Sequence, residues 1–210
     1  MARPVSEFAF AGGAASPRKR PEQRRSEDTV AAILTATIRV LEEAGEALTT
    51  TRVAEVAGVS VGTLYQYFGN REALINGVLA DHLESVIAAV ELAAEASRGL
   101  PRAVAAEAIS RAFVAIKAAR LSTTLLLDRV YGVGQLDDRA VVAAATRRAQ
   151  LALAPLWSDR PEAEARRRAG VVCAALEGVC RAAIAEDPRL LRDPAWCDQV
   201  VALAIGAIGG

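Results

Sequence analysis

The sequence predicts an all-α protein, and three observations lead to that fold class. Alanine dominates the composition and aromatic residues make up only 4%, which favours packed helices over β-structure. Apolar residues recur at three- and four-residue spacing from Val30 to Leu41, whereas no alternating run is long enough for a sheet. Apolar residues form 52% of the 210 positions, which is enough for a sizeable core.

Charge and cysteine content narrow the class of protein further. The formal net charge is zero, and the three cysteines form no C-x-x-C pair. This pattern fits a reducing compartment and argues against a disulfide framework or a zinc site. The longest apolar runs fall short of the roughly 20 residues that span a bilayer, and no secretory signal is evident. We therefore expect a cytoplasmic protein with no membrane partner, no metal and no cofactor.

Residues 1–25 read as a flexible basic arm, because they mix Pro, Gly, Ala and Arg without periodicity. The segment Pro17–Arg25 carries five basic residues and one acid. Such an arm is either a solvated tail or an electrostatic contact to phosphate, and charge alone leaves both interpretations open.

The first helix is predicted to begin at Ser26, with Glu27 and Asp28 in its first turn, where acids favour the helix dipole. Gly45 ends it.

A short helix, a tight turn and a second short helix follow. Thr49 or Thr50 caps the first of them, and Gly58 stops it. Ser60 caps a helix over 61–67, which completes a helix-turn-helix pattern. Asn70 then caps a long helix from Arg71 to roughly Ala96.

The remainder of the chain is predicted to be helical as well. The stretch "SRGLP" breaks the chain at 97–101, and "YGVGQLDD", "LWSDRPEA" and "EDPRLLRDP" are the later breaks. The expected helices cover about 102–119, 121–131, 137–154, 160–186 and 194–208.

The helix over 61–67 has two distinct faces. Leu64 and Phe68 lie four residues apart and share a face that should pack on the preceding helix. The residues predicted to point away from that core are Val61, Gly62, Tyr65 and Gln66. Gln66 offers a donor and an acceptor to a base edge, and Gly62 lets the backbone approach a partner closely. The alternative is that Tyr65 is simply an exposed aromatic residue.

The stretch "TTTRVAEVAGVSVGTLYQYFGNREALINGVL" resembles the DNA-binding region of the TetR (tetracycline-repressor-like) family of transcriptional regulators. The resemblance covers about residues 27–82. The matching positions are Thr49, Val53, Ala54, Ala57, Gly58, Val59, Ser60, Gly62, Thr63, Tyr65, Tyr67, Phe68, Glu72 and Leu74. This chain departs from the family pattern at Gly69, where lysine or serine is common, and so lacks one possible backbone contact.

The resemblance implies a three-helix DNA-binding domain over 26–82 and a larger helical domain over 83–210 that binds a small effector and forms a homodimer. It also implies a repressor that binds a double-stranded DNA operator and releases it when the effector binds. The predicted DNA contacts are Arg24, Arg25, Thr49, Thr51, Ser60, Val61, Gly62, Thr63, Tyr65, Gln66, Tyr67 and Arg71.

The helices over about 160–186 and 194–208 are rich in small residues, which let helices approach closely. They could pair with their symmetry mates or form internal core, and the resemblance favours the dimer. In the first of them, Glu177 and Arg181 are spaced as an intrahelical ion pair, although Glu177 could instead line a pocket. Cys173 and Cys180 share a face and read as buried apolar residues rather than redox sensors.

The bulky residues of the middle helices are candidates for core or for an effector pocket. The proposed pocket residues are Phe113, Leu127, Tyr131, Trp157 and Glu177. Tyr131 and Trp157 are favoured because each has a polar atom that can orient a ligand.

Two other classes of protein fit the sequence less well than a regulator. An enzyme is disfavoured because the chain has no phosphate loop or paired carboxylate motif, and its one histidine, His82, lies alone on the long helix. A helical scaffold would explain the second domain but would leave the Tyr65–Gln66 face without a role.

Overall fold

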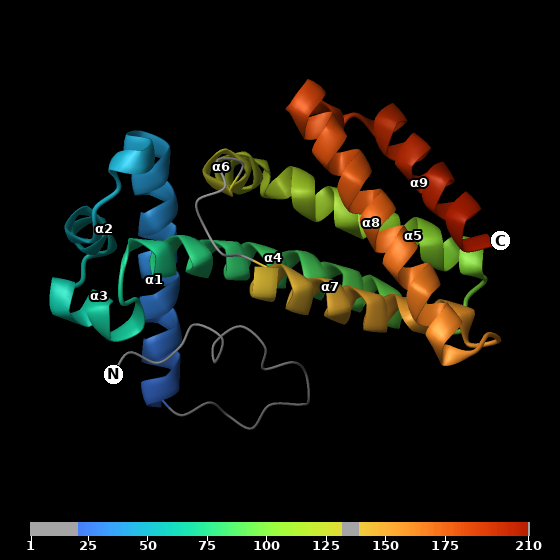
Figure 1. Cartoon of the computed structure of the whole chain (residues 1–210), viewed down its shortest axis with the longest axis horizontal. Coiled ribbons are helices and arrows are strands. Elements are labelled where there is room, and N and C mark those ends of the chain that lie inside the picture. Colours follow the sequence, from blue (N-terminus) through green and yellow to red (C-terminus); the bar gives the residue numbers. More distant parts are fainter. Residues whose placement is uncertain (1–20, 132–138, 210) are drawn as a thin grey trace. The chain divides into compact units, whose positions relative to one another are not determined.

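The computed structural model describes residues 21–131 and 139–209, and every regular element in these ranges is a helix (Figure 1). The all-α prediction is therefore confirmed. The elements are α1 (Pro21–Ala44), η2 (Gly45–Ala47), α2 (Thr50–Ala57), α3 (Val61–Tyr67), α4 (Arg71–Ala96), α5 (Arg102–Ala119), α6 (Leu121–Tyr131), α7 (Arg139–Leu153), η3 (Ala154–Trp157), α8 (Glu162–Glu186), η4 (Pro188–Arg192) and α9 (Pro194–Gly209), where η denotes a 3-10 helix.

The chain divides into two compact units. Among the described residues, unit 1 comprises 21–82 and 126–131, and unit 2 comprises 83–125 and 139–209. Helices α4 and α6 therefore each contribute residues to both units. The last part of α6 groups with α1, α2 and α3, although its sequence position lies far beyond them.

The predicted start of the first helix is wrong, because α1 begins at Pro21 rather than at Ser26. Proline suits the first helical position, because its fixed φ is close to that of a helix and because an N–H at this position makes no hydrogen bond within the helix. Glu22 then lies in the first turn, and arginine is a good helix former. Residues 21–25 of the predicted arm are thus helical, while residues 1–20 lie outside the described part of the chain.

The predicted caps of the next helices are confirmed. Of the two candidates Thr49 and Thr50, Thr49 caps α2; Ser60 caps α3, and the Oδ1 of Asn70 accepts a hydrogen bond from the N–H of Ala73 at 2.7 Å. Gly58 ends α2 with φ at 68°, in the left-handed region that glycine adopts without steric cost.

The core of unit 1 contains residues from α1, α2, α3, α4 and α6. Its fully or nearly fully buried members include Ile33, Leu41, Val53, Leu64, Phe68, Leu74, Ile75 and Leu126. Helix α4 comes so close to its neighbours that a Cβ on Gly77 would lie 2.7 Å from Cε1 of Phe68 and 2.9 Å from Cδ2 of Leu34. A glycine at this position therefore allows the three segments to pack together.

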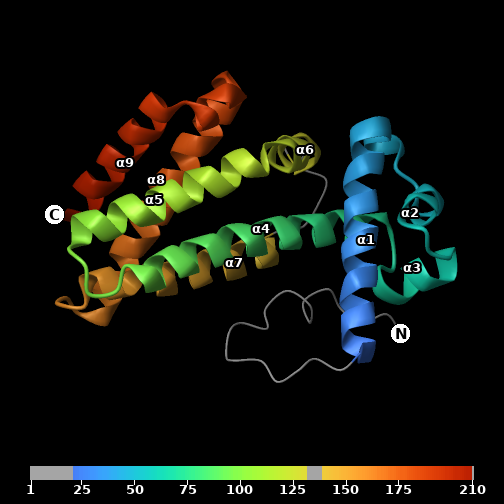
Figure 2. The ribbon, with the colours of Figure 1, turned by 180° about the vertical axis from the view of Figure 1, so that it is seen from behind.

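Unit 2 is built around α5, which packs mainly on α9, while α8 lies beside α9 in both views (Figures 1 and 2). Its core includes Phe113, Leu153, Trp157, Leu176 and Ile208. Helix α7 packs on the part of α4 that belongs to this unit, where Ile87 meets Ala145 and Ala149.

The later helices agree closely with the predicted ranges. Helices α5 and α6 match at both ends, and α9 extends one residue beyond the predicted 208. The break predicted at 156–163 begins within the 3-10 helix η3, and the break predicted at 186–194 contains the 3-10 helix η4; each of the two has a proline in its first two positions. Such short turns carry no apolar periodicity of their own, so the sequence pattern gave no sign of them.

Helix α4 is the single described helix that is long and apolar enough to cross a membrane by length and composition. However, 56% of its apolar window is buried inside the protein, as in a core helix. The expectation of short apolar runs overlooked it because scattered charges interrupt an otherwise apolar 26-residue segment.

Candidate nucleic-acid interface

Helix α3 is only seven residues long, so its neighbours and its cap must stabilise it. The Oγ of Ser60 accepts a hydrogen bond from the N–H of Thr63 at 2.9 Å. On the inner face, Leu64 is fully buried and Phe68 is nearly so. Burying a leucine side chain completely is worth roughly 1.5–3 kcal/mol, which helps to offset the unfavourable formation of so short a helix.

The opposite side of α3 is exposed, as predicted. This outer face consists of Val61, Gly62, Tyr65 and Gln66. Val61 is 38% exposed and Tyr65 is 45% exposed, so an apolar ring and an apolar branch point outward beside an amide. Apolar groups beside an exposed amide suit contact with a base edge in the major groove.

Hydroxyl groups surround this outer face in two pairs. The Oγ1 of Thr50, on the first residue of α2, lies 3.1 Å from the Oη of Tyr65. The Oγ of Ser60 lies 2.8 Å from the Oγ1 of Thr63. Each pair needs one hydrogen for its internal bond, which leaves a second hydrogen that can be donated outward.

The remaining predicted contacts lie on the flanking helices. Thr49 caps α2 by accepting from the N–H of Arg52 at 3.2 Å, and Thr51 is exposed on the same helix. Tyr67 is half-buried at the end of α3. Arg71 is half-buried at the start of α4, and its Nε is buried without a hydrogen-bond partner among the described residues.

The cations near the helix-turn-helix differ in their surroundings. Arg52 is paired with Glu55 at 3.2 Å and with Glu43 at 4.0 Å, so its charge is largely balanced within unit 1. Arg25 is exposed on α1, whereas the side chain of Arg24 lies outside the described residues. Arg25 and Arg71 are therefore the predicted cations that the structure describes.

The sequence pattern missed Thr50 as a member of this group. In the run Thr49-Thr50-Thr51, the pattern identified a cap but could not tell which neighbour would reach α3. A threonine fifteen residues from Tyr65 becomes its partner only when the turn at Gly58 folds α3 back against α2. The usual geometry of a helix-turn-helix, in which the second helix folds back on the first, is what could have indicated the Thr50–Tyr65 pair.

The predicted pocket residues are only partly brought together. Phe113 and Trp157 share the core of unit 2, and Leu127 is buried in unit 1. The side chain of Tyr131 lies outside the described residues. Trp157 is fully buried, and its Nε1 has no hydrogen-bond partner among the residues described.

Glu177 has a closer partner than the predicted one. Its Oε2 lies 2.8 Å from the Nζ of Lys117 on α5, whereas Arg181 on its own helix is 4.0 Å away. Lys117 is nearly fully buried, and its ammonium group stands 5.5 Å from the ring centre of Phe113. The Lys117 ammonium therefore contacts both Glu177 and Phe113. The apolar pattern of α5 did not indicate a buried lysine at this position.

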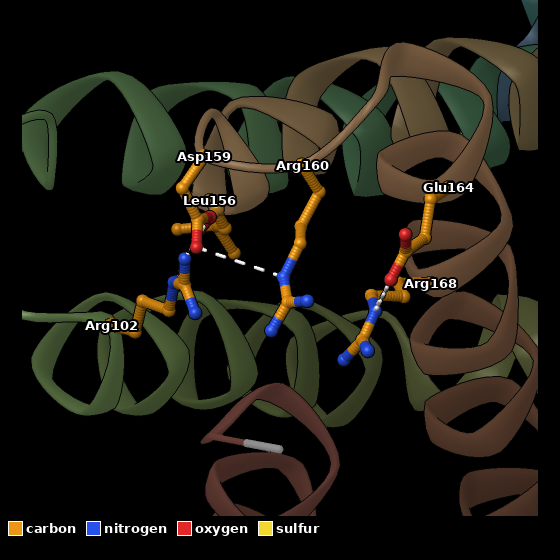
Figure 3. Close-up of polar contacts among 6 residues, drawn as sticks. All are labelled: Arg102, Leu156, Asp159, Arg160, Glu164 and Arg168. Atoms are coloured by element: carbon orange, nitrogen blue, oxygen red, sulfur yellow. Dashed lines mark hydrogen bonds and ion pairs between the residues drawn. The ribbon is translucent and has the colours of Figure 1, made fainter.

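A second polar cluster fixes the 3-10 helix that carries Trp157. The Nε of Arg102 donates to the carbonyl of Leu156 at 2.8 Å, and its Nη2 also pairs with Asp159 (Figure 3). This guanidinium holds the pKa of the Asp159 carboxyl below its usual value. Arg160 approaches the same carboxylate at 3.7 Å, and Arg168 pairs with Glu164 at 3.1 Å.

The surroundings of Cys173 and Cys180 favour buried apolar residues over redox sensors. Burial raises the pKa of Cys173 to about 11 and that of Cys180 to about 12. Because the thiolate is the reactive form, these thiols have little nucleophilic character near neutral pH. Among the described residues, no group of three or more histidine, cysteine or acidic side chains is arranged to hold a metal ion. His82 is buried in α4.

Comparison with known proteins extends these observations. Residues 33–78 match the family model for "Bacterial regulatory proteins, tetR family", which covers the end of α1 through the first turns of α4. No curated protein matches the chain significantly.

Solved structures share the fold over nearly the whole chain. A TetR-family transcription regulator from Marinobacter aquaeolei is 18% identical, with a TM-score of 0.64, over 88% of this chain and 97% of that one. A TetR-family regulator from Streptomyces coelicolor is 21% identical, with a TM-score of 0.63, over 86% and 98%. The fatty acid degradation regulator FadR from Bacillus halodurans is 16% identical, with a TM-score of 0.65, over 84% and 97%.

At these identities the structural likeness establishes the fold, and the family match falls on the helix-turn-helix whose outer face is described above. Members of this family are transcription factors and not enzymes. Residues 33–78 therefore form a DNA-binding domain of the tetR type, in a chain whose fold is that of solved TetR-family transcription regulators.

Proposed function

We propose that this protein is a cytoplasmic homodimeric repressor that binds a palindromic operator and releases it when a small molecule binds to unit 2. The observation that carries the proposal is the outer face of α3. The core packs against the inner side of this seven-residue helix, and its outer side exposes the ring of Tyr65, the amide of Gln66 and the backbone of Gly62, with hydroxyl groups beside them.

Each member of that face suits a contact in the major groove. Gln66 can donate to and accept from an adenine edge, and Val61 can contact a thymine methyl group. Gly62 allows the backbone to approach a base closely, because no side chain intervenes. Thr49, Thr51, Ser60, Thr63, Tyr67, Arg71 and the basic residues Arg24 and Arg25 are proposed to contact the phosphates that flank these bases.

A stripe on α8 and α9 supports the proposed dimer. On α8 the exposed residues Val171, Ala174, Gly178 and Ala182 recur at helical spacing. On α9 they are Leu203, Gly206 and Ala207. Val171 is 65% exposed and Leu203 is 47% exposed.

Nothing in the described part of the chain requires glycine at the two glycines of this α8–α9 stripe. A Cβ on Gly178 or on Gly206 would meet no atom of the described residues within 4 Å. Glycine inside a helix costs about 1 kcal/mol relative to alanine, so a close approach by a second copy is the physical reason that we propose. Two copies related by a twofold axis would place their α3 helices on a palindrome, one helical turn of roughly 34–36 Å apart.

The effector is proposed to bind in unit 2, near Phe113, Trp157 and Glu177. The unpaired Nε1–H of Trp157 could donate to an acceptor on such a ligand, and the Lys117–Glu177 pair would place charge nearby. Leu127 and Tyr131 of α6 belong to unit 1 and are not part of this proposed site. An effector would release DNA only through a difference in its affinity for the bound and free conformations.

Selection from random double-stranded DNA, followed by footprinting on the protein's own upstream region, tests DNA recognition. We expect a palindromic site and an affinity that falls steeply with salt. Gln66→Ala should relax the preference at one base pair in each half-site, by about 1–3 kcal/mol. Thr146→Ala, on an exposed position of α7, is the matched control. Equal losses of specific and non-specific affinity in Gln66→Ala would contradict the assigned role.

Sedimentation of two variants tests the proposed dimer face. Val171→Arg places a charge in the α8–α9 stripe and should yield monomers. Leu151→Arg makes the same change at another exposed apolar residue, on α7, and should leave the dimer intact. Dissociation by Leu151→Arg alone would move the interface away from α8 and α9.

The effector site is tested with compounds that release the wild-type protein from its operator. Trp157→Phe keeps a large aromatic ring in the core but removes the Nε1–H, whereas Trp196→Phe is the matched control. We expect Trp157→Phe to bind the operator normally and to require more compound for release. The same release curve for both variants would place the ligand elsewhere.

A further inference from the structure

The hydroxyl pair between α2 and α3 assigns a role to Thr50 that the cap pattern of α2 does not require. Thr49, not Thr50, caps the helix. Thr50 is the first residue of α2, and its Oγ1 lies 3.1 Å from the Oη of Tyr65. This hydroxyl serves neither the cap nor the core. The interaction that the structure describes for it is with the Oη of Tyr65.

Tyr65 has little else to fix its outer end. It is 45% exposed on a helix of only seven residues, whereas Leu64 beside it is fully buried. An exposed aromatic ring turns readily about its side-chain bonds on the nanosecond timescale. A hydrogen bond at the tip of the ring restricts that motion and fixes the direction in which the ring points.

We propose that Thr50 is a positioning residue, which holds the phenol of Tyr65 in the orientation that meets the operator. This proposal rests on the function proposed above, in which the outer face of α3 enters the major groove. In the pair, one hydroxyl hydrogen forms the internal bond and the other remains available for DNA. Thr50 thus acts before DNA arrives, by reducing the number of Tyr65 conformers that binding must order.

The pair also couples the two short helices. The core joins α2 to α3 through Val53, Leu64 and Phe68 on the buried side, and the Thr50–Tyr65 pair joins them on the exposed side. Figures 1 and 2 both show α2 and α3 side by side in unit 1. Contacts on both sides of the helix pair restrict a rocking motion of α3 that buried contacts alone would permit.

Four variants and their operator affinities test the role of Thr50. Thr50→Val keeps the shape of the side chain but removes the hydroxyl, and we expect a loss of about threefold to tenfold, the range for one neutral hydrogen bond. Thr50→Ser keeps the hydroxyl and should restore most of the affinity. Tyr65→Phe removes the other partner. In the Tyr65→Phe background, Thr50→Val should have almost no further effect, because the pair no longer exists.

Two results would overturn the proposal. If Thr50→Val weakened binding by the same factor in both backgrounds, Thr50 would contact DNA independently of Tyr65. If Thr50→Val changed nothing, the pair would have no influence on binding. Thr146→Val, which removes an exposed threonine hydroxyl on α7, is the control for the substitution itself.

A measurement without DNA separates this inference from the proposed function. With fluorotyrosine incorporated throughout the full-length protein, the ¹⁹F resonance of Tyr65 is assigned by its loss in Tyr65→Phe. We expect it to shift and narrow in Thr50→Val, towards the value of a freely rotating ring, and to be restored in Thr50→Ser. An unchanged resonance contradicts the positioning role. A shifted resonance in a protein that binds no operator would contradict the proposed function instead.

Discussion

Gly77 provides the most direct test of how closely unit 1 is packed. The substitution Gly77→Ala adds one methyl group in the middle of α4, where alanine should by helix propensity be better by about 1 kcal/mol. The new Cβ, however, would lie 2.7 Å from Phe68 and 2.9 Å from Leu34. Ordinary carbon contacts are about 3.5–4.0 Å, so both neighbours must move by roughly 1 Å.

The balance of these two effects predicts the sign of the change. Overpacking of a well-filled core costs typically 1–3 kcal/mol, and clashes with two different side chains place this site near the upper end, so the cost exceeds the gain in helix propensity. We therefore expect Gly77→Ala to lower the free energy of unfolding of unit 1 by about 2 kcal/mol. Because Phe68 is also the C-terminal cap of α3, operator affinity should fall as well.

Hydrogen exchange of the amides in α1 and α3 measures this effect within unit 1, apart from unit 2. Gly170→Ala is the matched control, because its Cβ would meet only the end of the flexible Gln150 side chain, at 3.2 Å. It should be neutral or stabilising by up to about 1 kcal/mol. If Gly77→Ala proved as stable as Gly170→Ala, the close approach of α4 to Phe68 and Leu34 would be refuted.

Three further predictions concern unit 2. Since burial raises the pKa of Cys180 to about 12, its native thiol should react with a disulfide reagent at pH 8 far more slowly than after unfolding, and rapid labelling would contradict this burial. Glu177→Gln removes the charge that pairs with the buried Lys117 ammonium and should lower the free energy of unfolding by about 1–3 kcal/mol, less than for a fully buried pair because Glu177 is 43% exposed. Lys117→Met removes the buried charge itself and should lower it by less in denaturant unfolding. The reverse order of the two variants would refute the argument. Arg102 lowers the pKa of Asp159, so Arg102→Gln should raise it in an NMR titration. The stability that this pair contributes should be present above the unfolded pKa of about 4 and be lost as pH falls through the lower folded value; no change in the Asp159 titration would mean that the pair does not form.

Local signals predicted the helices and the outer face of α3 well, because both depend on neighbours in the sequence. The caps at Thr49, Ser60 and Asn70 and the stop at Gly58 follow from short-range hydrogen bonding, and all four are found. The outward exposure of Tyr65 follows from the positions of Leu64 and Phe68.

The errors and omissions arose where a contact joins distant parts of the chain. The pairing of Glu177 with Lys117 spans sixty residues, and that of Thr50 with Tyr65 spans fifteen. No periodicity encodes either of them. The predicted start of α1 is too late because the mixture of Pro, Gly, Ala and Arg without periodicity indicates an arm, although arginine favours helices and Pro21 suits a helix start.

The participation of α6 in unit 1 has a consequence for protein engineering. Leu126 is buried in the same core as Ile33, Leu64 and Leu74, although more than forty residues separate it from the end of the helix-turn-helix match. A fragment cut at His82 would expose the site that Leu126 fills, and a chimera grafting this DNA-reading head onto another regulator would inherit the same void. A transplantable head therefore consists of two pieces of chain, and a swap should carry the last turns of α6 with it.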